Sequence, residues 1–188
     1  GAIDVLQENF GGQNEKLLAV QGDALMLPFK DNVFDFSYSI GVLHHTPDPG
    51  LGIRNIYRCL KDGGEFAIAL YGEGSYYDFP TITLWRNIFN WTWKFFGALP
   101  PLIYTYIFVS LIWPIGRISR YASFPFRLFF PIANLPDIRW SYLDTFDSIT
   151  PSYQSTHNAY EVQNFFKEAG FIDGKSTNWG STSYKGKK

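Results

Sequence analysis

The chain has 188 residues, of which 46% are hydrophobic and 18% are charged, and its formal net charge is -1. This length suits a single domain with a real core, and the low charge excludes a disordered acidic or basic tail. A balance this near neutrality argues against nucleic-acid binding by bulk charge, so we expect no nucleic-acid partner. The single cysteine, Cys59, excludes an internal disulfide and favours a reducing, cytoplasmic compartment.

Aromatic residues make up 19% of the chain, and their uneven placement divides it into three zones. We expect a core of alternating strands and helices over 1–74, an aromatic helical insertion or cap over 75–143, and the remainder of the core over 144–188. The chain begins with Gly1 and its only methionine is Met26, which favours a processed terminus or a fragment.

The first zone alternates elements of two periodicities. In chain order we expect a helix, two strands, a helix and a strand, at 2–10, 17–21, 34–39, 51–60 and 66–71. The glycine pairs at 11–12 and 63–64 are expected to end the two helices with turns. Strand, helix and strand in this order imply parallel pairing, and hence an α/β, doubly wound, Rossmann-like sheet.

The last zone contains one strongly signalled helix. Asn158 followed by Glu161 fits a capping-box start, and Gly170 is expected to stop the helix. The segments 171–176 and 181–185 then read as a closing antiparallel hairpin. The sheet is therefore expected to be mostly parallel, with an antiparallel end.

Two predicted strand ends carry distinctive residues, and ligands of open α/β sheets bind at such ends. Asp23 follows one strand, where its carboxylate either accepts a hydrogen bond from an amine or caps a turn. Gly41 follows the next strand and lets a ligand approach the backbone closely. His44 and His45 come after it and suit a base, a substrate contact or a structural role. Adjacent histidines seldom face one metal, and no Cys or carboxylate cluster completes a set, so we expect no metal.

Taken together and in order, these residues resemble one family. The motifs lie at Gly22-Asp23-Ala24-Leu25-Met26-Leu27-Pro28-Phe29, Asp31, Phe34-Asp35, Val42-Leu43-His44-His45, Asp48-Pro49 and Leu60-Lys61-Asp62-Gly63-Gly64. They are similar to those of class I S-adenosylmethionine-dependent methyltransferases, and more narrowly of the methyltransferase type 11 kind. The resemblance covers 1–74, and 158–185 fits the final helix and last strands of that family. The middle zone does not match and looks like an insertion.

The resemblance implies S-adenosylmethionine as the cofactor and methyl transfer to a small-molecule or lipid-like acceptor. The resemblance implies two groups of cofactor contacts. Those on the adenine side are Asp23, Ala24 and Leu25. Those on the methionine side are Ser39, Ile40 and Gly41. Asp23 would bind the adenine amine. His44 or His45 would face the acceptor pocket as the catalytic residue, needed as a base only where the acceptor must lose a proton.

The sequence also departs from the family pattern. The glycine-rich loop after the first strand of the family and the acidic residue that ends its second strand are not found. Neither 11–12 nor 63–64 follows a predicted strand and opens a helix, so neither replaces that loop. We therefore expect a fragment of the full enzyme that binds the cofactor poorly or not at all and exposes a sheet edge.

The middle zone combines aromatic and basic residues. It contains five of the six tryptophans, with six basic and two acidic residues, so its net charge is +4. The stretch 95–116 has no charged residue, but the prolines at 100–101 and 114 leave 102–113 as the longest uninterrupted helix. Three interpretations stay open: a cap over the substrate pocket, an interfacial helix with peripheral membrane contact through 85–130, and a true span.

Polar residues between the aromatic zone and the last helix could reach the acceptor. Asp144, Tyr153 and His157 are the substrate-binding candidates, although a solvated loop that caps the next helix is the simpler explanation. A rival to the enzyme is a non-catalytic methyltransferase-like module that binds a membrane surface or a partner through its basic aromatic insertion. A nicotinamide-dependent enzyme is disfavoured, because nothing in the sequence supplies the hydride-site pattern of the short-chain dehydrogenases.

Overall fold

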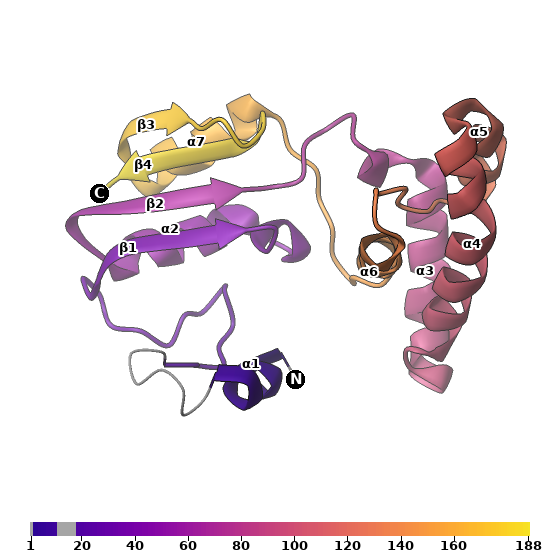
Figure 1. Ribbon diagram of the computed structural model, residues 1–188. Coiled ribbons are helices and arrows are strands. Elements are labelled where there is room, and N and C mark those ends of the chain that lie inside the picture. The colour runs from indigo at the N-terminus through magenta and orange to yellow at the C-terminus, as the bar shows by residue number, and fades with distance from the viewer. Residues whose placement is uncertain (1, 11–17) are drawn as a thin grey trace.

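The computed structural model describes residues 2–10 and 18–188 (Figure 1). The elements in chain order are α1 (Ala2–Phe10), β1 (Phe34–Ile40), η1 (Leu43–His45), α2 (Pro49–Cys59), β2 (Leu60–Ala69), η2 (Tyr76–Asp78), α3 (Pro80–Phe96), α4 (Leu99–Ile118), α5 (Arg120–Phe129), α6 (Ile138–Ile149), α7 (Ala159–Ala169), β3 (Ile172–Ser176) and β4 (Ser183–Lys187). The strands with α2 and α7 form one lobe, here called the sheet lobe. Helices α3 to α6 form a second, here called the helical lobe.

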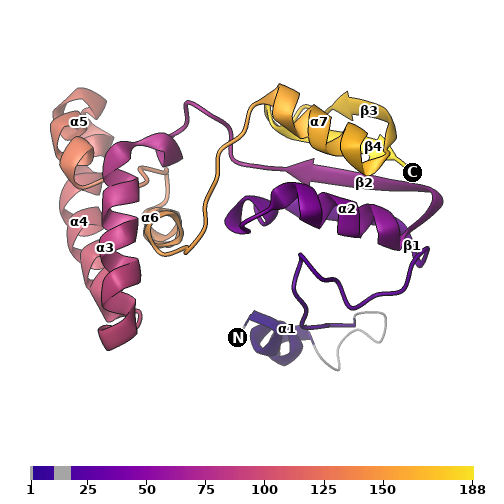
Figure 2. The same ribbon diagram turned by 180° about the vertical axis from the view of Figure 1, so that it is seen from behind.

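The sheet lobe has the predicted α/β, Rossmann-like architecture. Its strand order is β1-β2-β4-β3, with β1 and β2 parallel and the other pairs antiparallel. Helix α2 connects the two parallel strands, and α7 precedes the antiparallel pair, as the sequence predicted. Both helices pack on the same face of the sheet, as Figure 2 shows.

The core of the sheet lobe lies between that face and the two helices. Phe66 of β2 is fully buried and stacks on Phe166 of α7, with ring centroids 5.4 Å apart. The capping box of α7 is present: Asn158 Oδ1 accepts from the Glu161 N–H, and the Glu161 carboxylate accepts from the Asn158 N–H. Gly170 ends the helix with a φ of 100°, which a residue without Cβ adopts without strain.

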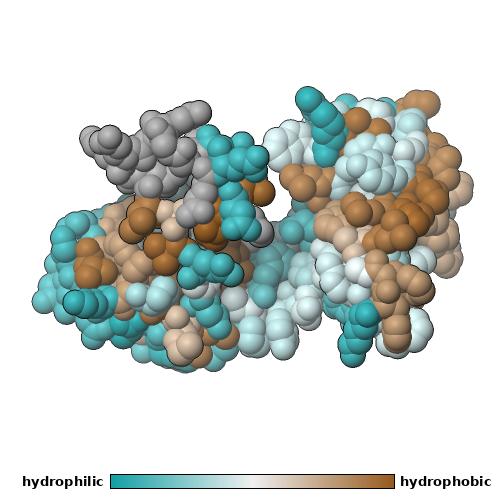
Figure 3. All heavy atoms as spheres, turned by 90° about the horizontal axis from the view of Figure 1, so that it is seen from below, coloured by the Kyte–Doolittle hydropathy of each residue, from teal (hydrophilic) through white to brown (hydrophobic). Residues whose placement is uncertain are grey.

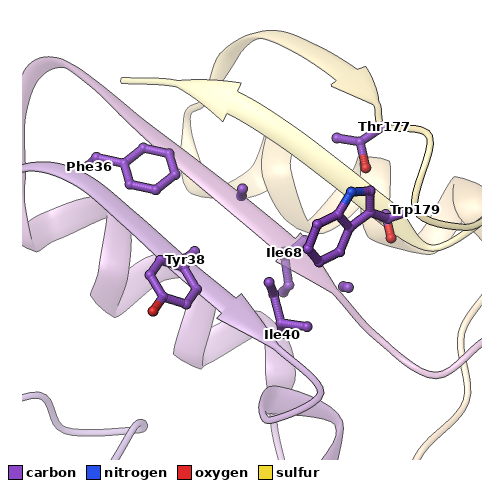
Figure 4. Close-up of a pocket in the computed structure, with 9 residues that line it drawn as sticks. Phe36, Tyr38, Ile40, Ile68, Thr177 and Trp179 are labelled. Atoms are coloured by element: carbon purple, nitrogen blue, oxygen red, sulfur yellow. The ribbon is translucent and has the colours of Figure 1, made fainter.

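The opposite face of the sheet is covered by no helix among the residues that the structure describes. Phe36, Tyr38 and Ile40 of β1 project there and are 54%, 69% and 46% exposed. Figure 4 shows them with Trp179 around a shallow apolar pocket of about 380 Å³. The outer edge of β1 likewise pairs with no described strand. The sheet lobe therefore presents an apolar face, and the expected exposed edge is found among the described strands.

Two local expectations in the first zone were wrong. The predicted strand at 17–21 is not formed over its described part, because Leu18 is 84% exposed and no described neighbouring strand pairs with its backbone. The predicted turn at 61–64 is part of strand β2. Gly63 has a φ of 80° within this strand, and the pairing of β2 with β1 is irregular between Phe34 and Phe36. The predicted helix stop at 11–12 lies outside the described residues.

The helical lobe is built around α4, which packs on α3, α5 and α6. Its two small cores centre on Tyr104 and Val109. Helix α4 is longer than the predicted 102–113. The prolines at 100–101 fall in its first turn, where a missing N–H costs little, and Pro114 is accommodated inside the helix.

Helix α6 corrects the expected boundary between zones. The boundary between 143 and 144 falls inside α6, whose packing partners are α3 and α4. Asp144 therefore lies on a helix of the helical lobe and not in a loop before the last helix. The periodicity of this segment is weak in sequence because small buried side chains, Ser141, Thr145 and Ser148, line its inner face.

Candidate functional site

The carboxyl ends of β1 and β2 border two neighbouring features, an apolar pocket and a cluster of polar aromatic side chains. The first, here called the β1-edge pocket, has a volume of about 470 Å³. It is bounded by the segment 24–29, by β1, by η1 and by α2. Its lining is mainly apolar and includes Ala24, Leu27, Phe29, Ser39, Ile40, Val42 and Ile56.

The adenine-side candidates lie at one end of this pocket. Ala24 lines it, whereas Asp23 and Leu25 do not. The exposed carboxylate of Asp23 accepts a hydrogen bond from the Leu25 N–H at 2.9 Å, and its other oxygen accepts no hydrogen bond from the described residues. This is a local turn of the Asx type that leaves one oxygen available to a ligand.

The methionine-side candidates come from the last turn of β1. Ser39 and Ile40 line the pocket, and the hydroxyl of Ser39 is buried without a hydrogen-bond partner. Gly41 has a φ of 70°, and a Cβ placed there would meet nothing within 4 Å. The glycine is therefore required by its backbone conformation, while the space beside it stays open to a ligand.

The donor set of the pocket fits the nucleoside half of S-adenosylmethionine. Flat apolar walls suit a purine ring, and the unpartnered Ser39 hydroxyl is a buried group that a ligand would satisfy. No carboxylate among the lining residues is available for the ribose, and the described residues contain no glycine-rich loop between a strand and a helix. The described residues thus supply part of a cofactor cradle.

The second feature, here called the ring stack, is formed by His44, Tyr71 and Tyr77. The rings of His44 and Tyr71 stack with centroids 3.7 Å apart, and those of Tyr71 and Tyr77 with centroids 3.8 Å apart. His44 comes from η1, Tyr71 directly follows β2, and Tyr77 lies on η2. The stack therefore runs from the sheet lobe towards the helical lobe.

His44 is fully buried and has a defined proton arrangement. The backbone N–H of Tyr71 donates to its Nδ1 at 3.3 Å, so the proton of the neutral ring is on Nε2, which has no partner. Burial lowers the pKa of His44 to about 3, and the nearby His45 and His157 add to the effect. His44 is therefore a neutral hydrogen-bond donor near neutral pH, an arrangement that does not suit a base.

His45 has the opposite arrangement. Its Nδ1 lies 3.2 Å from the carbonyl oxygen of Tyr153, which can only accept, so this nitrogen carries the proton. The lone pair of the neutral ring is then on Nε2, which lies 4.0 Å from the Asp147 carboxylate and has no hydrogen-bond partner. The neutral His45 ring therefore has an unpartnered lone pair that can accept a proton.

Two carboxylates of α6 contact the tyrosines of the stack. The Tyr77 hydroxyl donates to Asp144 at 3.0 Å, and the Tyr71 hydroxyl donates to Asp147 at 3.3 Å. Burial raises the pKa of Asp144, with the Tyr77 hydrogen bond opposing and the charge of Asp147 adding to the rise. Burial also raises the pKa of Tyr71 to about 12. The tyrosines are therefore neutral donors to α6.

The remaining substrate-binding candidates are placed differently. His157 is buried, and its ring nitrogens are both occupied, by the Ser155 hydroxyl at 2.8 Å and by Glu161 at 3.1 Å. Its backbone bonds to Tyr71 as well, so it fixes the connection between the lobes. Tyr153 contributes its carbonyl oxygen to His45, while its side chain is exposed. The structure thus gathers His44, His45, Tyr153 and Asp144 around the ring stack.

Sequence reasoning missed Tyr71 and Tyr77. A signal for Tyr71 existed, because it follows a predicted parallel strand at the edge where ligands bind. Tyr77 lay in the aromatic zone, where nothing in the pattern separated it from packing residues. No group of three or more His, Cys, Asp or Glu side chains that could hold a metal occurs in the described part of the chain.

Comparisons with known proteins match the chain to methyltransferases. The sequence profile described as "Methyltransferase domain" (Methyltransf_11) matches residues 1–68. Phosphoethanolamine N-methyltransferase 2 of Caenorhabditis elegans is 42% identical over 52 residues, which are 28% of this chain and 12% of that protein. Demethylmenaquinone methyltransferase of Paenarthrobacter aurescens is 32% identical over 105 residues, which are 50% of this chain and 38% of that protein.

The chain matches well under half the length of these curated relatives. Among solved structures, a SAM-dependent methyltransferase of Thermotoga maritima, titled a possible histamine N-methyltransferase, aligns with a TM-score of 0.50 and 16% identity. The alignment covers 98% of this chain and 70% of that one, and it shows a common fold. Residues 1–68 of the chain thus match a methyltransferase domain, and such a domain implies S-adenosylmethionine as its cofactor.

Proposed function

We propose that this protein transfers a methyl group from S-adenosylmethionine to a small-molecule or lipid-like acceptor, with His45 as the base. The observation that carries the proposal is the free Nε2 lone pair of His45 beside the ring stack. When bound, S-adenosylmethionine supplies a methyl group on a sulfonium, which a nucleophile displaces in line. His45 Nε2 takes the proton that the acceptor atom gives up as its new bond to carbon forms.

The residues around His45 have supporting roles in this proposal. The Tyr153 carbonyl holds the ring in one tautomer, and the Asp147 carboxylate, 4.0 Å from Nε2, stabilises the ring once it is protonated. Asp23 and Ser39 bind the nucleoside half of the cofactor in the β1-edge pocket. His44 donates from Nε2 to an acceptor oxygen, and Asp144 positions it through Tyr77 and the ring stack.

The helical lobe supports an amphiphilic acceptor. Its surface carries exposed large apolar side chains, including Trp91, Leu102, Ile103 and Ile107. The Paenarthrobacter aurescens relative is named for demethylmenaquinone and the Caenorhabditis elegans relative for phosphoethanolamine. We further propose a cytoplasmic protein that contacts a membrane peripherally through 85–130. The hypothesis that the glycine-rich loop and the ribose-binding acid lie upstream stays a prediction.

Calorimetric titration with S-adenosylhomocysteine tests the cofactor half of the proposal, using this chain and a version extended upstream. We expect tighter binding in the extended version and a loss of roughly tenfold on Asp23→Ala, the size of one hydrogen bond to a charged group. Asp62→Ala is the matched control, since Asp62 is an exposed carboxylate at the far end of β2. Equal affinities for Asp23→Ala and the unmodified protein would remove Asp23 from the cofactor site.

His45→Gln tests the catalytic half in the extended version. Loss of a general base lowers the rate by about 10²–10⁴-fold while S-adenosylhomocysteine affinity stays unchanged. Binding to vesicles by a protein that takes up no S-adenosylhomocysteine in either version would instead support the non-catalytic membrane module. The exposed apolar surface of the helical lobe is the observation that favours this second candidate.

A further inference from the structure

A small pocket in the helical lobe is lined by basic and hydroxyl side chains. It lies between η2 with the residues just before it and helix α5, and has a volume of about 250 Å³. Its polar lining comes from Ser75, Tyr76, Arg120 and Arg127, and Phe124 forms part of its wall. This volume is below the range of about 300–1,000 Å³ typical of drug-sized ligands, so it suits one small group.

Three polar atoms of this pocket are buried without a hydrogen-bond partner. They are Nε of Arg127 and the hydroxyl oxygens of Ser75 and Tyr76. A buried polar atom left unpaired costs about 1–3 kcal/mol, and more when the group is charged. All three side chains are donors, and they come from two segments about fifty residues apart in the sequence. Their convergence therefore leaves a place for an acceptor.

The charge of the pocket is not balanced by the protein. Within the described ranges, neither Arg120 nor Arg127 forms an ion pair with a carboxylate. Burial lowers the pKa of Arg127, with Tyr76 opposing and the charge of Arg120 adding to the fall. The nearby carboxylate of Asp78 is already engaged, by the Gly74 N–H and the Thr156 hydroxyl. Two like charges therefore lie close together without a counter-ion.

We propose that this pocket, here called the η2–α5 pocket, binds a phosphate-type oxyanion through Arg120, Arg127 and the Ser75 hydroxyl. The planar guanidinium fork matches phosphate oxygens in pairs, and the bonds are strengthened by charge on both partners. An oxyanion also relieves the repulsion between the two arginines and satisfies the unpartnered donors of Ser75 and Arg127. This site is separate from the β1-edge pocket and does not depend on the proposed methyl transfer.

The phosphate group has two sources, a lipid headgroup or a free phosphate ester. Exposed apolar side chains of α5 surround the pocket, with Phe124 53% and Leu128 41% exposed. On the face of the helical lobe that is seen from below, Figure 3 also shows gathered hydrophobic residues. An anion site with an apolar rim is suited to a headgroup at a membrane surface, and the experiment separates this source from the other.

The test measures binding of two probes to the full chain. One probe is inorganic phosphate, followed by calorimetry against chloride at matched ionic strength. The other is phosphatidylcholine vesicles with and without phosphatidic acid, followed by flotation. The variants are Arg127→Gln and Arg120→Gln, with Arg117→Gln as the control of equal charge. Arg117 is an exposed residue of α4 that lies over the Trp113 ring and outside the pocket.

We expect each pocket variant to weaken binding of at least one probe about tenfold or more, because it removes a direct hydrogen bond to a charged group. Arg117→Gln should weaken binding less than about twofold, because it changes only the general charge of the surface. Dependence confined to phosphate identifies a free phosphate ester, and dependence with phosphatidic acid identifies a headgroup. Equal effects of Arg117→Gln and Arg120→Gln, or no binding of either probe, overturn the proposal. Arg120 is exposed, so its variant keeps the test valid should Arg127→Gln fail to fold.

Discussion

The Tyr71 backbone N–H and the His44 ring are joined by a hydrogen bond of 3.3 Å that ends on Nδ1. A backbone N–H can only donate, so this one contact decides where the His44 proton resides. His45, the next residue, is held the other way round by the Tyr153 carbonyl. The two adjacent histidines therefore differ at Nε2, which is a hydrogen-bond donor in His44 and carries a lone pair in His45.

The first prediction concerns these two tautomers. Two-bond ¹H–¹⁵N correlation spectra of the protein at neutral pH should show His44 protonated on Nε2 and His45 protonated on Nδ1. The physical reason is the identity of each backbone partner, a donor for His44 and an acceptor for His45. His157 serves as the internal comparison, because both its ring nitrogens have side-chain partners. Finding His45 protonated on Nε2 alone would remove it as a base.

The second prediction concerns stability at low pH. Burial lowers the pKa of His44 from 6.5 to about 3, so the unfolded chain takes up a proton between these values and the folded chain does not. The contribution of neutral His44 to the free energy of unfolding is thus complete above pH 6.5. It is lost as the pH falls towards 3, at up to about 1.4 kcal/mol per pH unit.

Urea unfolding of the protein and of His44→Phe at about pH 8 and about pH 5 measures this slope. The variant should lose about 1 kcal/mol or more at the higher pH, because the Tyr71 N–H loses its acceptor, and should show a shallower pH dependence. Equal pH dependence in the two proteins would mean that His44 is protonated in the folded state.

The third prediction concerns the pair formed by Asp144 and Tyr77. Burial raises the pKa of Asp144, so ionisation of this group costs the folded state stability as the pH rises through the folded value. Asp144→Asn keeps an acceptor for the Tyr77 hydroxyl and removes that cost. It should therefore gain stability relative to the unmodified protein on going from acidic to neutral pH.

Tyr77→Phe changes the same pair in the opposite sense. It leaves a half-buried carboxylate without its donor and should cost about 1–3 kcal/mol in thermal unfolding at neutral pH. Asp62→Asn is the matched control, because Asp62 is an exposed carboxylate outside the pair. A loss for Asp62→Asn as large as that for Tyr77→Phe would show that surface charge, and not the pair, determines the effect.

The elements that could be predicted from the sequence are those that depend on residues close together in the chain. The capping box at Asn158 and the alternation in β1 depend on neighbours a few residues away, and both were found correctly. The ring stack joins Tyr71 and Tyr77 to residues of η1 and α6, contacts that no local spacing encodes. The strand prediction at 17–21 was wrong for a related reason. A strand needs a neighbouring strand to pair with its backbone, and an apolar run does not reveal whether one is present.

The fourth prediction separates two neighbouring glycines of the methyltransferase motif at 60–64. A Cβ on Gly64 would lie 2.9 Å from the Lys61 carbonyl oxygen and 3.2 Å from those of Asp35 and Phe34, all of them backbone atoms. Gly63 has space around it but a φ of 80°. Gly63→Ala should cost about 1 kcal/mol from backbone strain, and Gly64→Ala should cost more because β1 must move. Chemical denaturation ranks the two, and a reversed order would contradict the packing.

The fifth prediction concerns the apolar surface of α4. This is a helix long and apolar enough to cross a membrane by length and composition, and 28% of its most apolar stretch is buried in the protein. Ile103 and Ile107 lie one turn apart on it and are 50% and 48% exposed. Should this surface lie on lipid, replacing Ile107 with Lys places a charge where hydrocarbon contact is expected and lowers vesicle binding about tenfold or more.

Tyr38→Lys is the control for that variant, because it adds the same charge at a 69% exposed apolar position on the open face of the sheet. Flotation with anionic vesicles should be reduced by Ile107→Lys and unchanged by Tyr38→Lys, since a membrane contact through 85–130 involves the helical lobe alone. Equal reduction by both would point to general hydrophobic adsorption. Unchanged vesicle binding by Ile107→Lys would contradict lipid contact by α4. It would favour the interpretation of α4 as a cap over the acceptor site, because a cap does not need to contact lipid.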